Sequence, residues 1–383
     1  MSLYHIFKPD GLEKLGFEYL PPTLPHRESQ INDLLNALEP LIRGSPSSVI
    51  SPILHGPTGT GKTSTLRKVM SLIKEKTISR NLRLRTLLVN CSVSGRTFAI
   101  TQRICETIAE LPTRGYSDFE MLHRAYSELE IRDEYLLLGL DDLDGLIRRE
   151  GARILLLLSR IEESENLTRR IIPILVLRDI NTLQMLDKSL LSKISGIRIE
   201  FPPYTENEIK TIIEQRVELA FQPEVVSKES IRQISFNAFF FGGGDARYAI
   251  TLLQRSGFIA ANENSRKINV EHVRKAQYQI ENLFPVRLTE KVSKRDIIAL
   301  VAICEYFRSN PNAYFADLDE CLKIYLDLSR KIFEKVLTNE DFKKSLSRLI
   351  AEGALLKRQG IILPHMPADL LYKRLVNYLF RGM

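Results

Sequence analysis

Residues 56–63 read Gly56-Pro57-Thr58-Gly59-Thr60-Gly61-Lys62-Thr63, and this stretch decides the fold. It follows a short apolar run, Val49–Leu54, that predicts a strand, and it precedes a predicted helix. Glycines here let backbone N–H groups converge on a phosphate at the helix N-terminus, where the helix dipole favours an anion. In this pattern Lys62 reaches the β- and γ-phosphates, and the Thr63 hydroxyl is a ligand of Mg²⁺. The stretch therefore predicts a phosphate-binding loop (P-loop) for ATP or ADP with Mg²⁺.

A second apolar run, Tyr135–Leu140, ends in Asp141-Asp142-Leu143-Asp144. A buried strand that ends in acidic residues brings a carboxylate beside the P-loop, where Mg²⁺ requires oxygen ligands. We expect Asp141 to contact the metal directly or through water, and Asp142 to orient the attacking water. Carboxylates after an apolar run also commonly cap the next helix. The P-loop earlier in the chain favours the catalytic interpretation.

The 383 residues exceed one compact core, because domains typically hold roughly 100–200 residues. Short apolar runs separated by helical segments predict a parallel sheet covered on both faces, in an α/β domain of residues 1–202. The expected strands are Val49–Leu54, Leu84–Cys91, Tyr135–Leu140, Ile171–Leu177 and Ile197–Phe201. Helical segments are expected near Arg96–Leu111 and Asp118–Ile131, between the second and third of these strands. Residues 203–285 lack strand patterns and predict a helical domain. Its expected helices are Glu206–Phe221, Lys228–Phe239, Asp245–Ala261 and Val270–Leu283.

Residues 286–383 form a third predicted domain with a distinct charge. This segment holds 17 Lys and Arg against 12 Asp and Glu, so it carries +5 of the net charge of +7. Three helices, Lys294–Phe307, Phe315–Leu328 and Asn339–Ala351, precede two apolar runs joined by a glycine turn. This order is typical of a winged helix-turn-helix. Positive charge concentrated on such a domain indicates a polyanion such as DNA.

Composition excludes several other classes of protein. The longest apolar runs are far shorter than the roughly 18 residues that a membrane span requires. The opening MSLYHIFKPDG lacks the pattern of a secretory signal, so we expect a cytoplasmic, nucleoid-associated protein without a membrane partner. Four scattered cysteines without CxxC spacing predict free core thiols rather than a zinc site or disulfides.

The order of these motifs resembles the AAA+ ATPases, and more narrowly the archaeal origin-recognition initiators of the ORC/CDC family. The resemblance covers nearly the whole chain. It is carried by the P-loop, Leu136-Leu-Leu-Gly-Leu-Asp-Asp-Leu-Asp144, Leu24-Pro25-His26-Arg27, Phe201-Pro-Pro-Tyr204, Gly242-Gly-Gly-Asp-Ala-Arg247 and the predicted winged helix. It implies an AAA+ core, a helical lid and a winged helix that binds origin DNA. It also implies the replicative helicase and other initiator copies as partners.

The same resemblance assigns four residues to the nucleotide. Arg27 is assigned because Pro25-His26-Arg27 resembles the family's adenine-side segment, and Tyr204 and Arg216 match positions from which the lid closes on the nucleotide. Arg247 matches the lid arginine that reaches the γ-phosphate. An arginine in the first turn of a helix opposes the helix dipole, and an anionic ligand would compensate that cost. A solvated surface arginine is the alternative.

Three departures from the family predict slow ATP hydrolysis. Asp142 stands where the family usually has glutamate, and it is one methylene shorter. Arg178 stands where a polar sensor residue, usually asparagine, is expected, and Ser189 replaces the expected arginine finger. Such a finger can contribute roughly 10³–10⁵-fold in rate. We therefore expect a switch or slow timer rather than a motor.

The third predicted helix of the basic domain has one apolar and one basic face. Phe342, Leu346, Leu349 and Ile350 follow helical spacing and predict the buried face. The residues expected on DNA are Lys343, Lys344, Ser347 and Arg348 on this helix, with Lys357 and Arg358 at the hairpin tip. A winged helix that packs on protein is the alternative.

Three functions remain in order of preference. The first is an ATP-switched initiator that recognises origin DNA and helps load the replicative helicase. The second is a regulatory AAA+ ATPase whose winged helix binds protein, which predicts no salt-dependent DNA affinity. The third is a motor or clamp loader, against which Ser189 argues.

Overall fold

The computed structural model describes residues 5–45, 49–78, 80–109, 111–164, 169–194, 196–280, 292–333, 337–352 and 354–358, with 361–364, 367–368, 371–372 and 375–376. These residues form two compact units. One is Leu20–Tyr204, and the other joins the residues before Leu20 to those from Thr205 onward. None of the described helices is both long enough and apolar enough to cross a bilayer.

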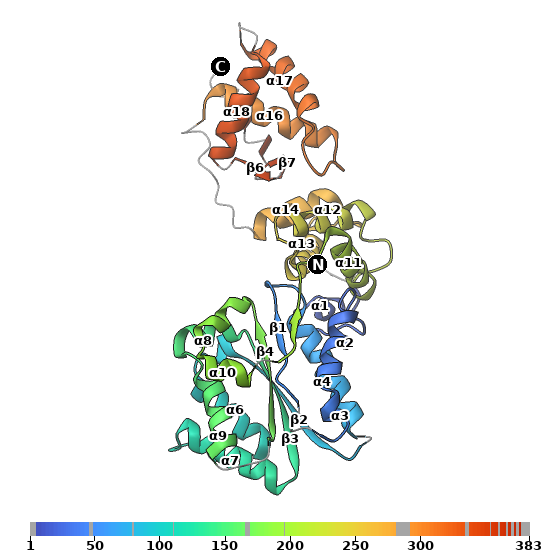
Figure 1. Ribbon diagram of the computed structural model, residues 1–383. Coiled ribbons are helices and arrows are strands. Elements are labelled where there is room, and N and C mark those ends of the chain that lie inside the picture. Colours follow the sequence, from blue (N-terminus) through green and yellow to red (C-terminus); the bar gives the residue numbers. More distant parts are fainter. Residues whose placement is uncertain are drawn as a thin grey trace. The chain divides into compact units, whose positions relative to one another are not determined.

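A five-stranded parallel sheet forms the centre of the Leu20–Tyr204 unit (Figure 1). The strand order is β2-β3-β4-β1-β5. The strands are β1 (Ile53–His55), β2 (Arg83–Asn90), β3 (Glu134–Asp141), β4 (Ile171–Leu177) and β5 (Arg198–Glu200). Because β4 lies between β3 and β1, the carboxyl ends of these three strands meet at one edge of the sheet.

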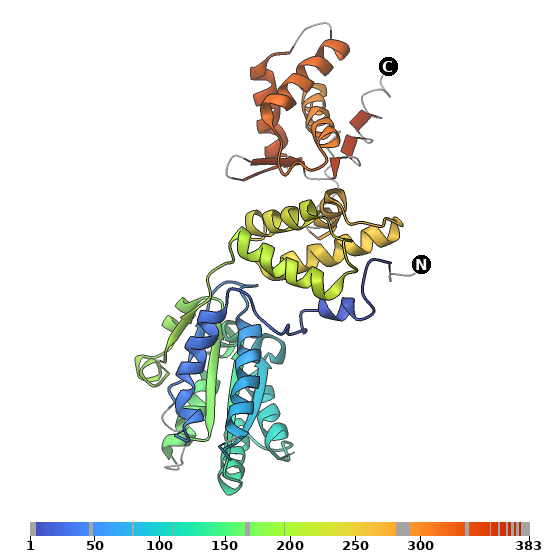
Figure 2. The same cartoon turned by 90° about the vertical axis from the view of Figure 1, so that its right-hand side faces the viewer.

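Helices cover both faces of this sheet, and alternate side chains of β3 and β4 enter two different cores. Leu136 and Leu138 pack with the core that includes α6 and α7, whereas Leu137 packs on the opposite face with α2 and α4. Figure 2 shows α2 and α4 side by side in front of the sheet. Burial on both faces explains why these strands are nearly continuous apolar runs.

The helices of this unit have the following bounds. They are α2 (Glu28–Ala37), α3 (Glu39–Ile42), α4 (Lys62–Ile78), α5 (Cys91–Ser94), α6 (Thr97–Ala109), α7 (Asp118–Ile131), α8 (Leu143–Glu150), α9 (Arg153–Ser164), the 3₁₀ helix η3 (Ile180–Met185) and α10 (Lys188–Lys193). The expected strand Val49–Leu54 was wrong in its bounds, because β1 begins only at Ile53. The Pro52 carbonyl accepts the N–H of Leu175 on β4 at 3.0 Å, but Pro52 has no N–H to donate, so the register of β1 with β4 and β5 begins at Ile53.

The second unit begins with a short helix, α1 (Gly11–Lys14), that packs on α11. The N–H of Lys8 donates to the carbonyl of Ala220 at 2.9 Å. A Cβ at Gly11 would lie 2.0 Å from that same carbonyl oxygen, so only glycine permits this approach. The sequence assigned this segment to residues 1–202, and the division into three domains stays a prediction. The helices that follow are α11 (Glu206–Ala220), α12 (Lys228–Phe240), α13 (Ala246–Asn262) and α14 (Val270–Ile280).

Three helices and an antiparallel hairpin follow in the basic segment, as the sequence predicts. They are α16 (Lys294–Ser309), α17 (Leu318–Ile332), α18 (Asn339–Ala351), β6 (Leu355–Arg358) and β7 (Ile361–Pro364). Phe307, Tyr325 and Phe342 contribute to their shared core. The helix expected to start at Phe315 starts at Leu318 instead. The Asp317 side chain caps this end of α17 by accepting hydrogen bonds from the backbone N–H groups of Asp319 and Glu320.

All four cysteines are free and buried. Burial raises the pKa of Cys91 and Cys321 to about 12 and that of Cys105 to about 11. Because only the thiolate reacts, these pKa values and the burial both predict slow reaction with an aromatic disulfide reagent at pH 8. We expect the folded chain to release almost no thiol absorbance over minutes, and the chain in guanidinium chloride to titrate all four. Rapid release from the folded chain would show that these thiols are accessible.

Candidate nucleotide site

The P-loop occupies the turn between β1 and α4, as the sequence predicts. The N–H of Gly56 donates to the carbonyl of Leu177 on β4, at 3.3 Å, which anchors the start of the loop. Gly56 and Gly61 have φ angles of 145° and 87°. A Cβ at Gly56 would lie 2.2 Å from the carbonyl oxygen of Phe201, and one at Gly61 would lie 2.6 Å from the Tyr204 hydroxyl. Both positions therefore require glycine.

Lys62 lies at the first position of α4 with only 7% of its surface exposed. Its Nζ donates to the carbonyl oxygens of Gly56 and Pro57 at 2.5 and 2.6 Å. The loop thus curves around a buried ammonium at the N-terminus of a 17-residue helix. A buried cation beside free helix N–H groups has the chemistry that binds phosphate oxygens.

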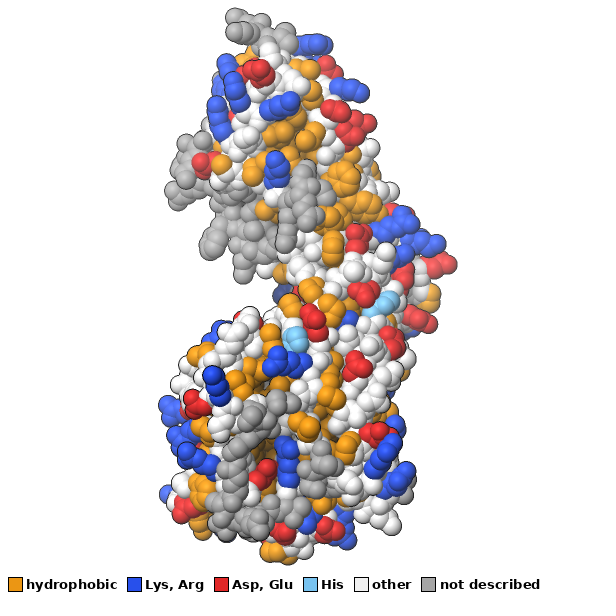
Figure 3. All heavy atoms as spheres, in the orientation of Figure 1, with side chains coloured by type: hydrophobic (Ala, Val, Ile, Leu, Met, Phe, Trp, Pro, Cys, Tyr) orange, Lys and Arg blue, Asp and Glu red, His pale blue; other side chains and the backbone are white. Residues whose placement is uncertain are grey.

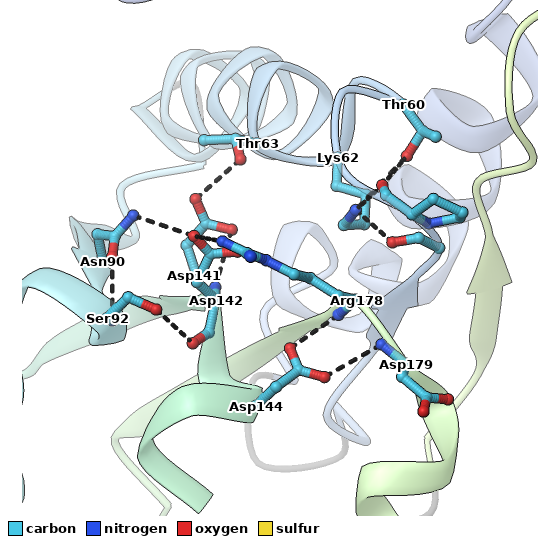
Figure 4. Close-up of polar contacts among 12 residues, drawn as sticks. Thr60, Lys62, Thr63, Asn90, Ser92, Asp141, Asp142, Asp144, Arg178 and Asp179 are labelled. Carbon is cyan, nitrogen blue, oxygen red and sulfur yellow. Dashed lines mark hydrogen bonds and ion pairs between the residues drawn. The ribbon is translucent and has the colours of Figure 1, made fainter. Parts of the chain in front are cut away.

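Thr63 and Asp141 come from different elements and meet beside the P-loop (Figure 4). The Thr63 hydroxyl donates to Asp141 Oδ2 at 2.8 Å, and Asp141 is only 5% exposed. Hydroxyl and carboxylate oxygens are the donors that Mg²⁺ prefers. These two side chains therefore fit the magnesium site that the sequence predicts.

Asp142 lies next to this pair but is engaged by an arginine. Its backbone is left-handed, with φ 53° and ψ 43°, at the start of α8. Arg178 Nε and Nη2 donate to the two carboxylate oxygens of Asp142, each at 2.9 Å (Figure 4). The Asn90 amide nitrogen also donates to Asp142 Oδ2, at 3.4 Å. Hydrogen bonds from Arg178 to Asp142 and the negative charge of that carboxylate hold the pKa of Arg178 above its ordinary value.

Asp144 organises the backbone that follows β4. It is 4% exposed, and its carboxylate accepts the N–H groups of Arg178 at 2.8 Å and Asp179 at 3.1 Å. It also accepts the Thr182 hydroxyl at 3.1 Å. A buried carboxylate with three such donors fixes the loop that carries Arg178.

Replacing Asp144 by alanine is expected to destabilise the chain by about 2–4 kcal/mol, because three buried donors lose a charged acceptor. Thermal unfolding of the full chain measures the effect. Replacing the nearby exposed Asp187 by alanine is the control and should change the melting temperature little. Equal melting temperatures for the two variants would contradict this role.

Sequence reasoning did not identify Asn90 or Asp144 as site residues. Asn90 is the last residue of β2, and its side chain caps α5 by accepting the N–H groups of Ser92 and Val93. Polar residues that directly follow neighbouring parallel strands meet at the same edge of a sheet, and this pattern would have found Asn90. Asp144 resembled an ordinary first-turn acidic residue of a helix, so nothing in the sequence distinguished it.

Arg27 and Tyr204 lie against the P-loop in the same unit. The Arg27 guanidinium donates to the carbonyl oxygens of His26, Thr60 and Pro202, at 2.6, 2.8 and 2.8 Å. It also lies 3.7 Å from the centre of the Tyr204 ring. Arg27 is 2% exposed, so it acts on the site by holding the backbone of the loop. Direct contact of Arg27 or Tyr204 with nucleotide stays a prediction.

Arg216 and Arg247 belong to the other unit. Arg216 is buried in α11, donates to the carbonyl of Lys14 at 2.6 Å and lies 5.2 Å from the centre of the Tyr19 ring. Burial lowers the pKa of Arg216. Arg247 is exposed in the first turn of α13, and its N–H is capped by Asp245 at 2.7 Å. Their approach to nucleotide stays a prediction.

The basic helix α18 has the two faces that the sequence predicts. Phe342, Leu346 and Leu349 are buried, and Ile350 packs against the same core. The other face of α18 is exposed and carries Lys343, Lys344, Ser347 and Arg348. The Ser347 hydroxyl donates to the carbonyl of Lys343 at 3.0 Å, and Arg348 Nη1 lies 3.5 Å from Asp296 Oδ2. Figure 3 shows Lys and Arg side chains over the region of α18.

Lys357 and Arg358 are the last two residues of β6 rather than the tip of the hairpin. Lys357 is exposed and pairs in register with Ile362, and Arg358 pairs with Ile361. The turn at positions 359 and 360 lies outside the described residues.

The parallel sheet, the P-loop between β1 and α4 and the acidic end of β3 define a P-loop ATPase of the AAA+ class. Two family descriptions match the chain: "AAA ATPase domain" over residues 23–192 and "Cdc6 AAA+ ATPase-type lid domain" over residues 210–278. ORC1-type DNA replication protein 2 of Sulfolobus acidocaldarius is 31% identical over 381 residues, which cover 95% of this chain and 91% of that protein. The chain belongs to the ORC1-type family of DNA replication proteins.

Other relatives agree with this assignment. An ORC1-type DNA replication protein of Desulfurococcus amylolyticus is 34% identical over 76% of this chain and 74% of its own length. The crystal structure of Cdc6p from Pyrobaculum aerophilum matches 98% of this chain and 99% of its own with a TM-score of 0.78 and 25% identity. The Aeropyrum pernix ORC1 protein, solved in complex with DNA, has a TM-score of 0.65 at 24% identity over 98% of this chain and 97% of its own, which supports the fold. The predicted AAA+ architecture is confirmed.

Proposed function

We propose that this chain is an ATP-switched replication initiator that binds origin DNA through its winged helix. The exposed basic face of α18 carries this proposal. Lys343, Lys344 and Arg348 are exposed there, while Phe342 and Leu349 on the same helix are buried. In a winged helix the third helix enters the major groove, so these cations would meet phosphates and base edges. The family of the chain supports a DNA partner for this face.

The nucleotide is held by residues of the Leu20–Tyr204 unit in this proposal. Residues 56–61 supply backbone N–H groups, Lys62 supplies a cation, and Thr63 with Asp141 supplies oxygen ligands for Mg²⁺. Bound Mg²⁺ would neutralise charge on the phosphates. Tyr204 and Arg27 close one side of the loop, and Arg216 and Arg247 act from the lid.

Hydrolysis is expected to be slow. Asp142, the residue proposed to orient water, is one methylene shorter than the glutamate that the family usually has, so it reaches the water less well. Ser189 on α10 stands where the resemblance placed an arginine finger. A bound ATP would therefore persist, and the protein would stay in its ATP-bound state for a long time. We propose that this state favours origin binding, gathering of further copies and recruitment of the replicative helicase at the nucleoid.

A protein partner for the winged helix is the second candidate. Phe315 and Leu318, near the start of α17, are 47% and 37% exposed. Exposed apolar side chains are enriched at protein contacts. This candidate predicts no affinity for DNA that depends on salt.

Recovery of DNA from sheared genomic fragments tests the initiator function. The full chain with a non-hydrolysable ATP analogue is mixed with fragments from its source organism, and the bound fragments are sequenced. The proposal expects strong enrichment of a few discrete loci. Uniform recovery of the genome would contradict origin recognition, and recovery of no DNA would favour the protein partner.

A further inference from the structure

Arg178 leaves the sheet between the P-loop and the acidic end of β3. The last residue of β4, Leu177, pairs in register with His55, and its carbonyl accepts the N–H of Gly56 at 3.3 Å. On the other side of β4 lies β3, which ends at Asp141. The side chain of Arg178 thus starts at a point flanked by the phosphate cradle and the carboxylates.

The side chain turns toward the carboxylates in the structure. Both oxygens of Asp142 accept from Arg178, while Asp144 holds the Arg178 N–H at 2.8 Å (Figure 4). The backbone of Arg178 is therefore fixed by a buried group, and only its long side chain remains to select a partner. A planar guanidinium binds phosphate with the same two-pronged geometry as carboxylate.

The ion pair is accessible enough to exchange. The Arg178 side chain is 52% exposed and that of Asp142 is 20% exposed. Water reaches the exposed guanidinium of this pair, and screening there limits the free energy that the pair contributes. A terminal phosphate with more charge than one carboxylate competes effectively for the same guanidinium.

We propose that Arg178 is a latch that exchanges Asp142 for the terminal phosphate of ATP. With ADP or without nucleotide, Arg178 pairs with Asp142 and keeps that carboxylate from the attacking water. With ATP, the guanidinium moves to the terminal phosphate, and Asp142 accepts a hydrogen bond from water in its place. This inference rests on the nucleotide site of the proposed function and adds how that site distinguishes ATP from ADP.

Equilibrium titrations with Mg²⁺-ADP and a non-hydrolysable Mg²⁺-ATP analogue test the latch. Arg178→Ala is expected to lower affinity for the analogue about tenfold and affinity for ADP less than about twofold, because only the analogue has the terminal phosphate. Arg178→Lys should fall between, since it keeps the charge and loses the fork. Arg148→Ala removes an exposed cation from neighbouring α8 and should leave both affinities unchanged.

A spectroscopic measurement follows the exchange itself. In full chain labelled with ¹⁵N-arginine, the Nε–H resonance of Arg178 is assigned by its loss in Arg178→Lys. The latch predicts the same resonance without nucleotide and with ADP, and a shift of that resonance by Asp142→Asn in both states. The ATP analogue should move the resonance to a position that Asp142→Asn no longer alters.

The outcomes separate the two proposals. If the wild-type chain binds neither nucleotide, the proposed nucleotide site and the latch both fail. If nucleotides bind but Arg178→Ala weakens both equally or neither, only the latch fails. A resonance that still responds to Asp142→Asn with the analogue bound would also overturn the exchange.

Discussion

Replacing Lys62 by alanine is expected to lower the affinity for both ATP and ADP by at least about thirtyfold, because it removes a charge-assisted phosphate contact worth roughly 2–3 kcal/mol. The ammonium is buried and lies between the carbonyl oxygens of Gly56 and Pro57. No other cation of the P-loop can replace it, since residues 56–63 contain a single charged side chain. Calorimetric titration with each Mg²⁺-nucleotide measures the loss.

Lys74→Ala is the matched control for this change. Lys74 is an exposed lysine further along the same helix, α4, so its replacement removes an equal charge at a distance from the loop. Its nucleotide affinity should equal that of the wild type. Equal affinities for Lys62→Ala and Lys74→Ala would show that the P-loop does not hold the nucleotide.

The triple replacement of Lys343, Lys344 and Arg348 by alanine is expected to weaken DNA binding and flatten its salt dependence. Each phosphate contact adds about 0.9 to the slope of log affinity against log salt, so three contacts add up to about 2.7. Titrations of a fluorescent duplex at several salt concentrations give the slope. An unchanged slope would mean that α18 does not touch the DNA backbone.

Two controls separate DNA contact from charge and folding. Lys228, Arg232 and Lys267 are exposed cations of the lid, and their replacement by alanine changes the net charge equally. Their variant should keep the wild-type slope. Because Arg348 lies 3.5 Å from Asp296, the double variant Lys343→Ala, Lys344→Ala leaves that ion pair intact and should still lower the slope by up to about 1.8.

Elements with strong signals in their own sequence were predicted most accurately. The strand Ile171–Leu177 and the helices Asp118–Ile131 and Asn339–Ala351 match the structure at both ends. Their boundaries coincide with strong local chemistry, such as the Ser117 and Thr338 capping boxes. Local sequence therefore determined both the type and the limits of these elements.

Other elements depend on contacts that sequence periodicity does not reveal. The helices α8 and α9 were not predicted, because the apolar run Ile154–Leu158 in α9 is compatible with a short buried strand as well as a helix. The strand β1 has only three residues, since its extent is set by its partners β4 and β5. Strand order is a property of the fold rather than of any single segment.

The candidate site likewise has features that the sequence predicts and one that it does not. The P-loop and Asp141 could be predicted, because a local motif and an apolar strand end determine their positions. The pairing of Arg178 with Asp142 could not be predicted from the sequence. It requires β3 and β4 to be neighbours and Asp144 to hold the backbone of Arg178. The sequence identified Arg178 only as a departure from the family.

Nucleotide in the P-loop is proposed to control the binding of this initiator to DNA. A titration of the full chain with origin-like and random duplexes, across a salt series, with ADP and with a non-hydrolysable ATP analogue, tests it most directly. We expect tight binding that falls steeply with salt, favours the origin-like duplex and differs between the two nucleotides. Weak binding to every duplex in both nucleotide states would contradict it.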